Sequence, residues 1–397
     1  MMSTTTRRQF LRSSPLIAMA PSIPLFLRST AQAAPVAEPQ RILVVIQLNG
    51  GNDGINTVVP VADEGYAKHR RELRLKADRL IGLTDEVSLH RSFRPVADLI
   101  EDGKFAIVQG VGYPNPNRSH DVSMAIWQTA RLDREEHKSC GWLGRALDLR
   151  EGSTGAADSI LLGKESPPVA LRGRRSMSVS LAHPGDLKLK NDLQIMPADL
   201  GGDDLLSFAR RATLDARATA DLIDDVAKIS SSEESSYPKT QLASRLNSIG
   251  QLIKSGFTTP VYYAIQSGYD THAAQLPTHA RLLNELAGAL KAFQNDLQAA
   301  GLDDRVLTIC FSEFGRRVEE NASLGTDHGT VGPVFAMGTK VKAGLLGTAT
   351  DMTNLKNGDL RRQFDFRQIY ATVLEDWLSI NPEAVLGSRF NKLPLLT

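Results

Sequence analysis

Five short apolar runs, each next to a cluster of polar residues, constrain the fold of this chain more than any other feature. Four runs are followed by such a cluster, and the fifth is preceded by one. Apolar, β-branched runs of this length are typical of strands buried on both faces, as in a parallel sheet. Ligands of such sheets bind beyond the carboxyl ends of the strands, so polar residues from distant segments are expected to meet at one edge. The runs are Ile42–Leu48, Phe105–Val108, Val261–Ile265, Val306–Phe311 and Pro333–Met337.

Segments with helical periodicity alternate with these runs. Alternation at both ends of the chain predicts one α/β fold, a mostly parallel sheet sandwiched by helices. Three shorter apolar runs between prolines and glycines are interpreted as further strands. The expected helices are Ser92–Asp102, His120–Leu132, Gln275–Ala300 and one near Phe366–Leu378, and the further strands are Ser159–Leu162, Pro168–Leu171 and Met177–Leu181.

The middle of the chain has a different character. Asp203–Ile229 and Gln241–Lys254 are helical in period, with a Ser/Glu-rich break at Ser230–Ser236. They carry few candidate ligands, so we expect helical cover or an insertion at about residues 200–256 of an α/β domain spanning 34–397. Without residues 1–33, about 364 of the 397 residues remain, which exceeds the usual size of a single core, so one large domain with an insertion, or two domains, is expected.

The first thirty-three residues contain the three parts of a twin-arginine signal peptide in the expected order. Thr6–Arg12 contains Arg-Arg followed by Phe-Leu, Pro15–Leu27 is moderately apolar, and Ala31–Ala33 offers a small-residue cleavage site. The apolar stretch is too short and too interrupted by proline to span a bilayer. We therefore expect cleavage after Ala33, with Ala34 as the alternative, passage through the twin-arginine translocase, and a periplasmic or secreted mature protein.

Charge and cysteine content exclude several classes of protein. Residues 1–33 hold four arginines and no acidic residue, so their removal turns the formal net charge of +1 slightly negative. Such a surface has no basic field for nucleic acid, and no later segment is apolar enough to cross a membrane. Cys140 and Cys310 do not form a disulfide framework, and Cys310 is expected in a core strand.

Gly268–His272 places a carboxylate and an imidazole directly after a predicted strand. Asp270 and His272 are two residues apart, and His279 follows seven residues later. Carboxylate with imidazole suits Zn²⁺, Mn²⁺ or iron better than Mg²⁺ or Ca²⁺, which prefer oxygen ligands alone. The alternative is Asp270 as a helix N-cap and His272 as a surface residue.

Thr326–Gly329 is the second candidate metal-binding segment. It contains Asp327 and His328 between glycines, which let the backbone approach a ligand closely, and it precedes the run Pro333–Met337. In the alternative interpretation, Asp327 caps a turn.

Glu313 stands directly beyond a predicted strand, where an uncompensated carboxylate would be costly. It requires a metal, a proton or one of the neighbouring cations Arg316 and Arg317. An ion pair between Arg316 and Glu313 without a catalytic role is the alternative.

Ser119 lies where a loop is expected to become a helix. Its hydroxyl is a candidate nucleophile if a metal or base lowers its proton affinity, and a helix N-terminus favours a bound anion. Its position equally suits an N-cap, worth about 1 kcal/mol. His120 either orients the site or is simply packed.

Asn49–Gly54 (NGGNDG) lacks the pattern of a P-loop or of a dinucleotide fingerprint. Asp53 and Asn52 supply oxygen ligands at the end of the first strand. A tight Asp-Gly turn is the alternative role.

Several long motifs in this order resemble the exported bacterial family called domain of unknown function 1501, over essentially all of the mature chain. That family is grouped with the alkaline-phosphatase-like superfamily, which includes the sulfatases. The resemblance implies a large α/β sandwich, two adjacent metal ions and a Ser, Thr or modified Cys nucleophile. The matching segments are Asn49–Thr57, Ala106–Trp127, Gly268–His272, Leu307–Arg317, Gly325–Pro333 and the end around Asp365–Trp377.

The resemblance also implies roles for individual residues. Ser119 resembles the nucleophile, and Arg118 or Arg316 would neutralise the charge that develops on the ester. The resemblance implies a set of metal ligands as well. The chain departs from the superfamily at one of them, because Glu313-Phe314 stands where an Asp-His pair is usual. These ligands are Asp53, Asp270, His272 or His279, Glu313, Asp327 and His328, for one or two divalent ions, with zinc or manganese favoured.

Two functions follow as expectations. The first is an exported metal-dependent hydrolase that acts on a small anionic substrate, a phosphate or sulfate ester. The second is a non-catalytic exported binding or assembly protein on a degenerate scaffold, with a second exported protein as its partner. The departure at Glu313 motivates the second.

Overall fold

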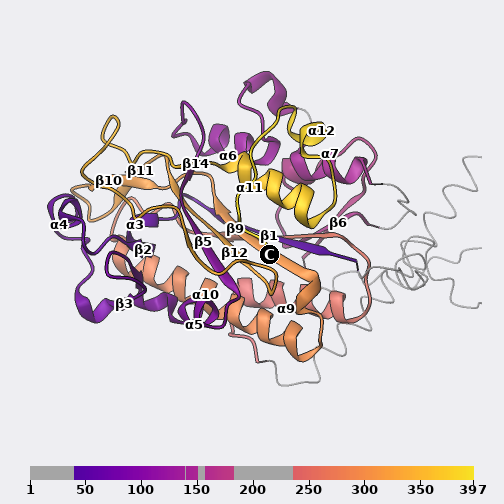
Figure 1. Ribbon diagram of the computed structural model, residues 1–397, viewed down its shortest axis with the longest axis horizontal. Coiled ribbons are helices and arrows are strands. Elements are labelled where there is room, and N and C mark those ends of the chain that lie inside the picture. Colours follow the sequence, from indigo (N-terminus) through magenta and orange to yellow (C-terminus); the bar gives the residue numbers. More distant parts are fainter. Residues whose placement is uncertain (1–39, 139, 151–156, 183–235) are drawn as a thin grey trace, which may run out of the picture.

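The computed structural model describes residues 40–138, 140–150, 157–182 and 236–397 (Figure 1). The expected signal peptide and the expected helix Asp203–Ile229 lie outside these residues. The second expected helix of the middle section is present as α9 (Gln241–Lys254). No helix in the described part of the chain combines the length and apolar character needed to cross a bilayer.

Within the described residues, the central sheet has nine strands in the order β13-β5-β12-β9-β1-β8-β6-β7, with β14 beside β5. The five runs that the sequence predicted as strands all lie in this sheet. The strands are β1 (Ile42–Asn49), β5 (Phe105–Gly112), β6 (Ser159–Leu162), β7 (Ser178–Leu181), β8 (Val261–Ser267), β9 (Val306–Ser312), β12 (Gly332–Met337), β13 (Gly344–Leu346) and β14 (Phe364–Asp365).

The sheet is mostly parallel, as predicted, with one reversed strand. In β1, Val44 is the register partner of Tyr262 in β8 and of Thr308 in β9, both in parallel ladders. Strand β12 runs antiparallel to β5 and β9, with Phe335 opposite Cys310. Because β12 is reversed, its beginning lies at the edge where its neighbours end. The polar segment before β12 therefore reaches the same edge as the polar segments after the other strands.

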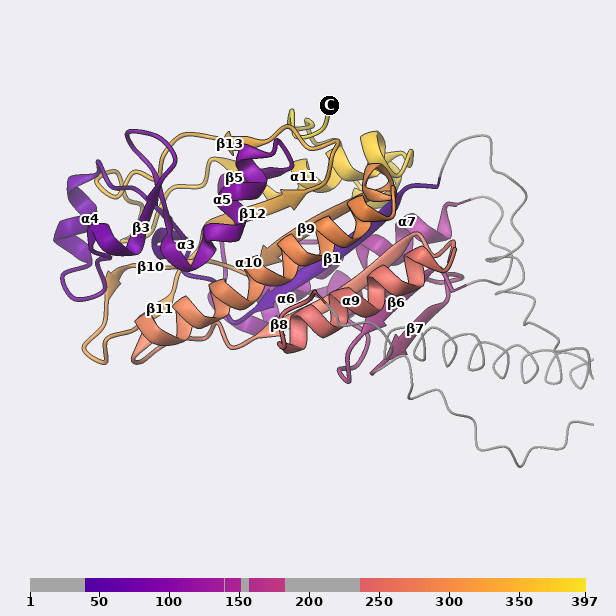
Figure 2. The ribbon, with the colours of Figure 1, turned by 90° about the horizontal axis from the view of Figure 1, so that it is seen from below.

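Helices cover both faces of the sheet (Figures 1 and 2). Alternate residues of β1 divide between two cores: Val44 and Ile46 pack in one, and Leu43 and Val45 pack in the other. This alternation makes β1 buried on both sides, which the continuous apolar run predicted. The first core includes α5 (Arg94–Glu101), α9 and α10 (Gln275–Ala299), and the second includes α6 (His120–Thr129), α7 (Trp142–Asp148), α11 (Phe366–Thr372) and α12 (Pro382–Leu386).

Smaller elements surround the carboxyl edge of the sheet. A three-stranded sheet has the order β2-β4-β3, and β10 pairs with β11 in a hairpin. These elements are α3 (Gly54–Thr57), β2 (Val58–Val59), α4 (Glu64–His69), β3 (Leu80–Gly82), β4 (Ser88–His90), β10 (Arg316–Glu320) and β11 (Thr326–His328). The 3-10 helices of the described residues include η1 (Ala77–Arg79), η2 (Arg91–Phe93), η3 (Arg134–Lys138) and η6 (Asp303–Arg305), of which η6 directly precedes β9.

One local prediction requires correction. The segment Pro168–Leu171 is not a strand but the 3-10 helix η4 (Val169–Leu171), because Pro168 has no N–H for a strand ladder and its carbonyl accepts from Leu171 at 3.0 Å. The expected final helix near Phe366–Leu378 is present as α11, which continues directly into a π-helical turn, η7 (Val373–Trp377).

Candidate functional site

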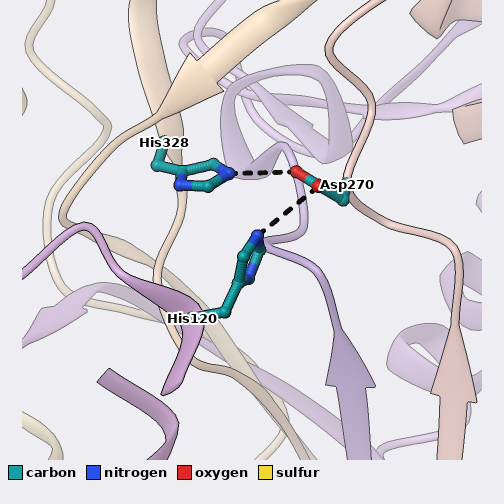
Figure 3. A group of neighbouring side chains, drawn as sticks. All are labelled: His120, Asp270 and His328. Atoms are coloured by element: carbon teal, nitrogen blue, oxygen red, sulfur yellow. Dashed lines mark hydrogen bonds and ion pairs between the residues drawn. The ribbon is translucent and has the colours of Figure 1, made fainter. Parts of the chain in front are cut away.

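Three segments that are distant in sequence bring His120, Asp270 and His328 together (Figure 3). His120 begins α6, Asp270 follows β8, and His328 ends β11. One ligand atom from each residue lies within 4.8 Å of the others. Asp270 and His328 were predicted from the sequence, whereas His120 was not among the predicted ligands.

Local backbone geometry places these residues. Gly268 has a φ of +113°, which lets the chain turn sharply after β8 toward Asp270. A Cβ on Gly50 would lie 2.4 Å from the Asp270 nitrogen, so the loop after β1 packs directly on this turn. The Asn117 side chain accepts from the Ser119 N–H at 2.8 Å, an Asx turn that leads the chain into α6. His328 is placed by the β10–β11 ladder, opposite Arg316.

Asp270 is the centre of the cluster. Its Oδ1 lies 3.0 Å from His328 Nε2 and 3.0 Å from His272 Nε2, and its Oδ2 lies 3.5 Å from His120 Nε2. Partial burial raises the pKa of this carboxyl, but the hydrogen bond from Arg316 and its positive charge outweigh burial and lower the pKa to about 2. Asp270 is therefore a carboxylate anion at neutral pH.

The three histidines share one orientation. The Nδ1 atom of each lies near an oxygen: Glu313 Oε1 at 2.8 Å for His120, Asp327 Oδ1 at 3.2 Å for His272, and the Arg118 carbonyl at 2.7 Å for His328. Carboxylate and carbonyl oxygens only accept, so each Nδ1 donates, and in the neutral ring each Nε2 then keeps its lone pair. All three Nε2 atoms face Asp270. Metal-binding histidines are commonly fixed in this way through the other ring nitrogen.

The Nε2 atoms lack ordinary partners for these lone pairs. His272 Nε2 and His328 Nε2 are 2.9 Å apart, so two lone pairs face each other unless a proton or a cation lies at this point. His120 Nε2 is buried and has no hydrogen-bond partner. Buried polar atoms are nearly always satisfied, so three converging Nε2 atoms and one carboxylate are suited to a bound divalent cation.

Glu313 lies behind His120. It is fully buried, and it accepts from the Gly50 N–H at 2.9 Å and from the Ser312 hydroxyl at 3.0 Å besides His120. The hydrogen bond to Glu313 raises the pKa of His120. Glu313 was predicted as a metal ligand or an ion-pair partner of Arg316, and the structure gives it instead the position of a carboxylate that orients a histidine.

Arg316 is enclosed and holds the loops of the site. Its side chain is fully buried, and it donates to Asp270 Oδ1 and to the Tyr269 carbonyl, both at 2.7 Å. It also donates to the carbonyls of Gly51 and Thr326, both at 2.8 Å, and to that of Gly50. The predicted role of Arg316 in neutralising charge on a substrate does not fit, because its donors are already engaged.

Asp53, a predicted metal ligand, is held in a separate buried network. Its two oxygens accept from Arg70 at 2.7 and 3.0 Å, and Gln275 donates to one of them. Burial acts to raise the pKa of Asp53, but the Arg70 charge and hydrogen bonds leave it below the ordinary value. The guanidinium of Arg70 thus supplies the cation that a metal ion was expected to supply.

His279 is not brought to the cluster either. Its Nε2 lies 3.0 Å from Asn52 Oδ1 and 3.3 Å from the Thr57 hydroxyl. Complete burial lowers its pKa to about 4. Of the two histidines that the sequence left open, His272 is the one beside Asp270.

Ser119 is exposed at the N-cap position of α6, and its side chain makes no capping hydrogen bond. It directly precedes His120, and the adjacent Arg118 carbonyl accepts from His328. The Arg118 guanidinium pairs with Asp359. Asp327 is exposed, and hydrogen bonds from Asn321 and His272 lower its pKa.

The family model described as "Protein of unknown function (DUF1501)" matches residues 40–392. The chain belongs to the DUF1501 family. This confirms the family resemblance that the sequence motifs indicated. No curated protein matches this DUF1501 chain.

Solved structures with some likeness to this DUF1501 protein are distant in sequence. The PsFucS1 sulfatase from Pseudoalteromonas sp. is 12% identical, with 93% of this chain and 72% of that chain covered and a TM-score of 0.41. A Vibrio parahaemolyticus protein in the alkaline phosphatase superfamily is 10% identical, with 79% and 64% covered and a TM-score of 0.36. Murine ectonucleotide pyrophosphatase/phosphodiesterase 5, in an inactive form with AMP, is 8% identical, with 86% and 96% covered and a TM-score of 0.41. Likenesses this slight carry no conclusion about activity.

Proposed function

We propose that this protein is a metal-dependent hydrolase of phosphate or sulfate esters, with His120, Asp270, His272 and His328 as the ligands of one divalent ion. The convergence of three Nε2 atoms on the Asp270 carboxylate carries the proposal. Imidazole donors favour Zn²⁺ or Mn²⁺ over Mg²⁺ or Ca²⁺. When bound, such an ion acts as a Lewis acid that polarises the ester and lowers the pKa of a nearby hydroxyl.

Ser119 is the proposed nucleophile. Its backbone is tied to two of the ligands, since His120 is the next residue and the Arg118 carbonyl accepts from His328 at 2.7 Å. The hydroxyl would bond to phosphorus or sulfur while the alcohol of the ester leaves with a proton. Water would then release phosphate or sulfate and restore the hydroxyl. Arg118 is exposed and adjacent, so it is placed to contact the anionic ester.

One ion per chain is proposed instead of two. The second site implied by the family resemblance would need Asp53, whose oxygens are bonded to Arg70. A fixed guanidinium and a metal ion would compete for the same carboxylate.

Metal analysis of the purified mature protein tests this proposal most directly. We expect about one zinc or manganese ion per chain, a loss of that ion in His328→Ala, and retention in His137→Ala, a histidine whose ring bonds the Arg131 carbonyl at 3.1 Å. Hydrolysis of aryl phosphate or aryl sulfate should disappear in Ser119→Ala with the metal content unchanged. Absence of bound metal together with unchanged hydrolysis in Ser119→Ala would contradict the proposal.

A binding or assembly role without catalysis is the second candidate. The engagement of Asp53 by Arg70 favours it, because it removes one of the two expected metal sites. In that case a second exported protein should co-purify with the chain, and neither Ser119→Ala nor His328→Ala should alter this binding.

The site is proposed to work outside the cytoplasm. The twin arginine Arg7-Arg8 and the small-residue motif ending at Ala33 support passage through the twin-arginine translocase. Replacing Arg7 and Arg8 by lysine should retain the uncleaved chain inside the cell, as measured by fractionation and by N-terminal sequencing of the exported product.

A further inference from the structure

A large basic groove adjoins the candidate site. It is a cavity of about 900 Å³ that begins at the loop of residues 113–118 and is lined by backbone and side chains of the segment 356–362. Arg118 is shared between this groove and the loop that leads into His120. The charged side chains of the groove are Arg118, Arg317, Lys356, Arg361, Arg362 and Asp359.

Positive charge exceeds negative charge in this groove. Asp359, the acidic residue of the lining, is buried and pairs with Arg118 and, at 3.9 Å, with Arg317. Arg362 pairs with Asp365 at 2.8 Å. Arg361 bonds a neutral partner, Asn354, at 2.7 Å, and Lys356 is exposed, so these two cations carry the excess positive charge. Concave walls concentrate such a field, which attracts anions.

A smaller cavity of about 200 Å³ continues from the groove and shares Val331, Leu360 and Arg361 with it. Its lining is partly apolar, with Val58 and Pro333. Gln109 also lines it; this side chain is 3% exposed and its Nε2 has no hydrogen-bond partner. An unsatisfied buried amide donor requires an oxygen acceptor from a ligand or solvent.

We propose that the groove and this smaller cavity together bind an oligosaccharide that carries several sulfate or phosphate groups. Lys356 and Arg361 contact its anionic groups, and the Gln109 amide donates to a sugar oxygen while apolar side chains pack on the C–H face of the ring. A single inorganic anion would leave most of a 900 Å³ groove empty, whereas pockets of 300–1,000 Å³ ordinarily enclose ligands of several rings.

The inference rests on the proposed function, which decides the bond that is cleaved. Binding of the oligosaccharide in the groove does not require the metal. The test therefore uses the mature chain carrying His328→Ala, so that loss of hydrolysis does not affect the result. Three probes of equal length are titrated by calorimetry: maltohexaose, sulfated maltohexaose and phosphorylated maltohexaose. The two charged probes distinguish a sulfate preference from a phosphate preference.

We expect a charged probe to bind, with an affinity that falls as salt is raised, and the neutral probe to bind at least tenfold more weakly. Lys356→Gln with Arg361→Gln should weaken charged-probe binding about five- to tenfold, a loss in keeping with two ionic contacts. The matched control is Lys340→Gln with Lys342→Gln, two exposed lysines outside the groove, and it should bind as the parent does.

The amide is tested separately through Gln109→Leu, with a thermal melt to show that the variant is folded. It should weaken the charged probes without changing the salt dependence of their binding. Equal binding of neutral and charged probes, or unchanged binding in the Lys356/Arg361 variant, would overturn the proposal. So would failure of both charged probes to bind a folded protein.

Discussion

Glu313 Oε1 and His120 Nδ1 lie 2.8 Å apart, which joins a fully buried carboxylate to an imidazole at the rim of the sheet. The opposite ring nitrogen of His120 is directed toward Asp270. A carboxylate placed in this way selects the tautomer with a free Nε2 lone pair and increases its basicity. In the proposed metal site, Glu313 would therefore act on the ion through His120.

The first prediction concerns Glu313. Glu313→Gln should reduce zinc or manganese affinity about 10- to 100-fold, the usual effect of removing such a partner. Competition with a chelator of known affinity measures this change. Glu319→Gln, at an exposed carboxylate that contacts His69, should leave the affinity unchanged. If Glu313→Gln binds metal as tightly as the parent, the positioning role is wrong.

Arg316→Lys should lower metal affinity and stability together. Lysine cannot span Asp270 and the four carbonyl groups that the planar guanidinium reaches. We expect a loss of about 2–4 kcal/mol in the free energy of unfolding, measured with denaturant on the metal-free protein. Arg317→Lys, at the next and partly exposed position, should cost less than 1 kcal/mol.

The Asp53–Arg70 pair predicts that the free energy of unfolding decreases as the pH is lowered into the acid range. The pKa of Asp53 in the folded state is lowered from 3.8, so its contribution to stability is present above pH 3.8 and is lost as the pH falls through the folded pKa. Asp53→Asn removes this pH dependence and leaves the Arg70 charge buried without its partner, at a cost of about 3–5 kcal/mol at neutral pH. Denaturant titrations between pH 2 and pH 7 compare the two proteins, and an equal pH dependence would count against the pair.

Ser119 is expected to matter for chemistry and not for stability. An N-cap serine ordinarily contributes about 1 kcal/mol, but the Ser119 side chain makes no capping hydrogen bond. Ser119→Ala should therefore shift the unfolding free energy by less than about 0.5 kcal/mol. Thr240→Ala is the matched control, since Thr240 caps α9 by accepting from the Ala243 N–H at 3.3 Å. It should lose about 1 kcal/mol.

The sequence alone determined the sheet and the place of the site. The continuous apolar runs required strands buried on both faces, and these runs are β1, β5, β8, β9 and β12. Asp270, His272 and His328 could be selected because each adjoins such a strand. These features are local, since hydrophobic periodicity and turn residues act over only a few positions.

Only the tertiary structure decided which polar residues belong to the candidate site and which ones hold the surrounding loops in place. Asp53 and Asp270 both follow buried strands. Asp53 is bonded to Arg70, whereas Asp270 contacts both Arg316 and the histidines of the cluster. The reversal of β12 places His328 at the common edge, and the start of α6 adds His120. Ion pairs and convergent lone pairs depend on distances of a few ångströms between residues that are 17 (Asp53 and Arg70), 46 (Asp270 and Arg316) or 193 (His120 and Glu313) positions apart, and that information is absent from any local sequence pattern.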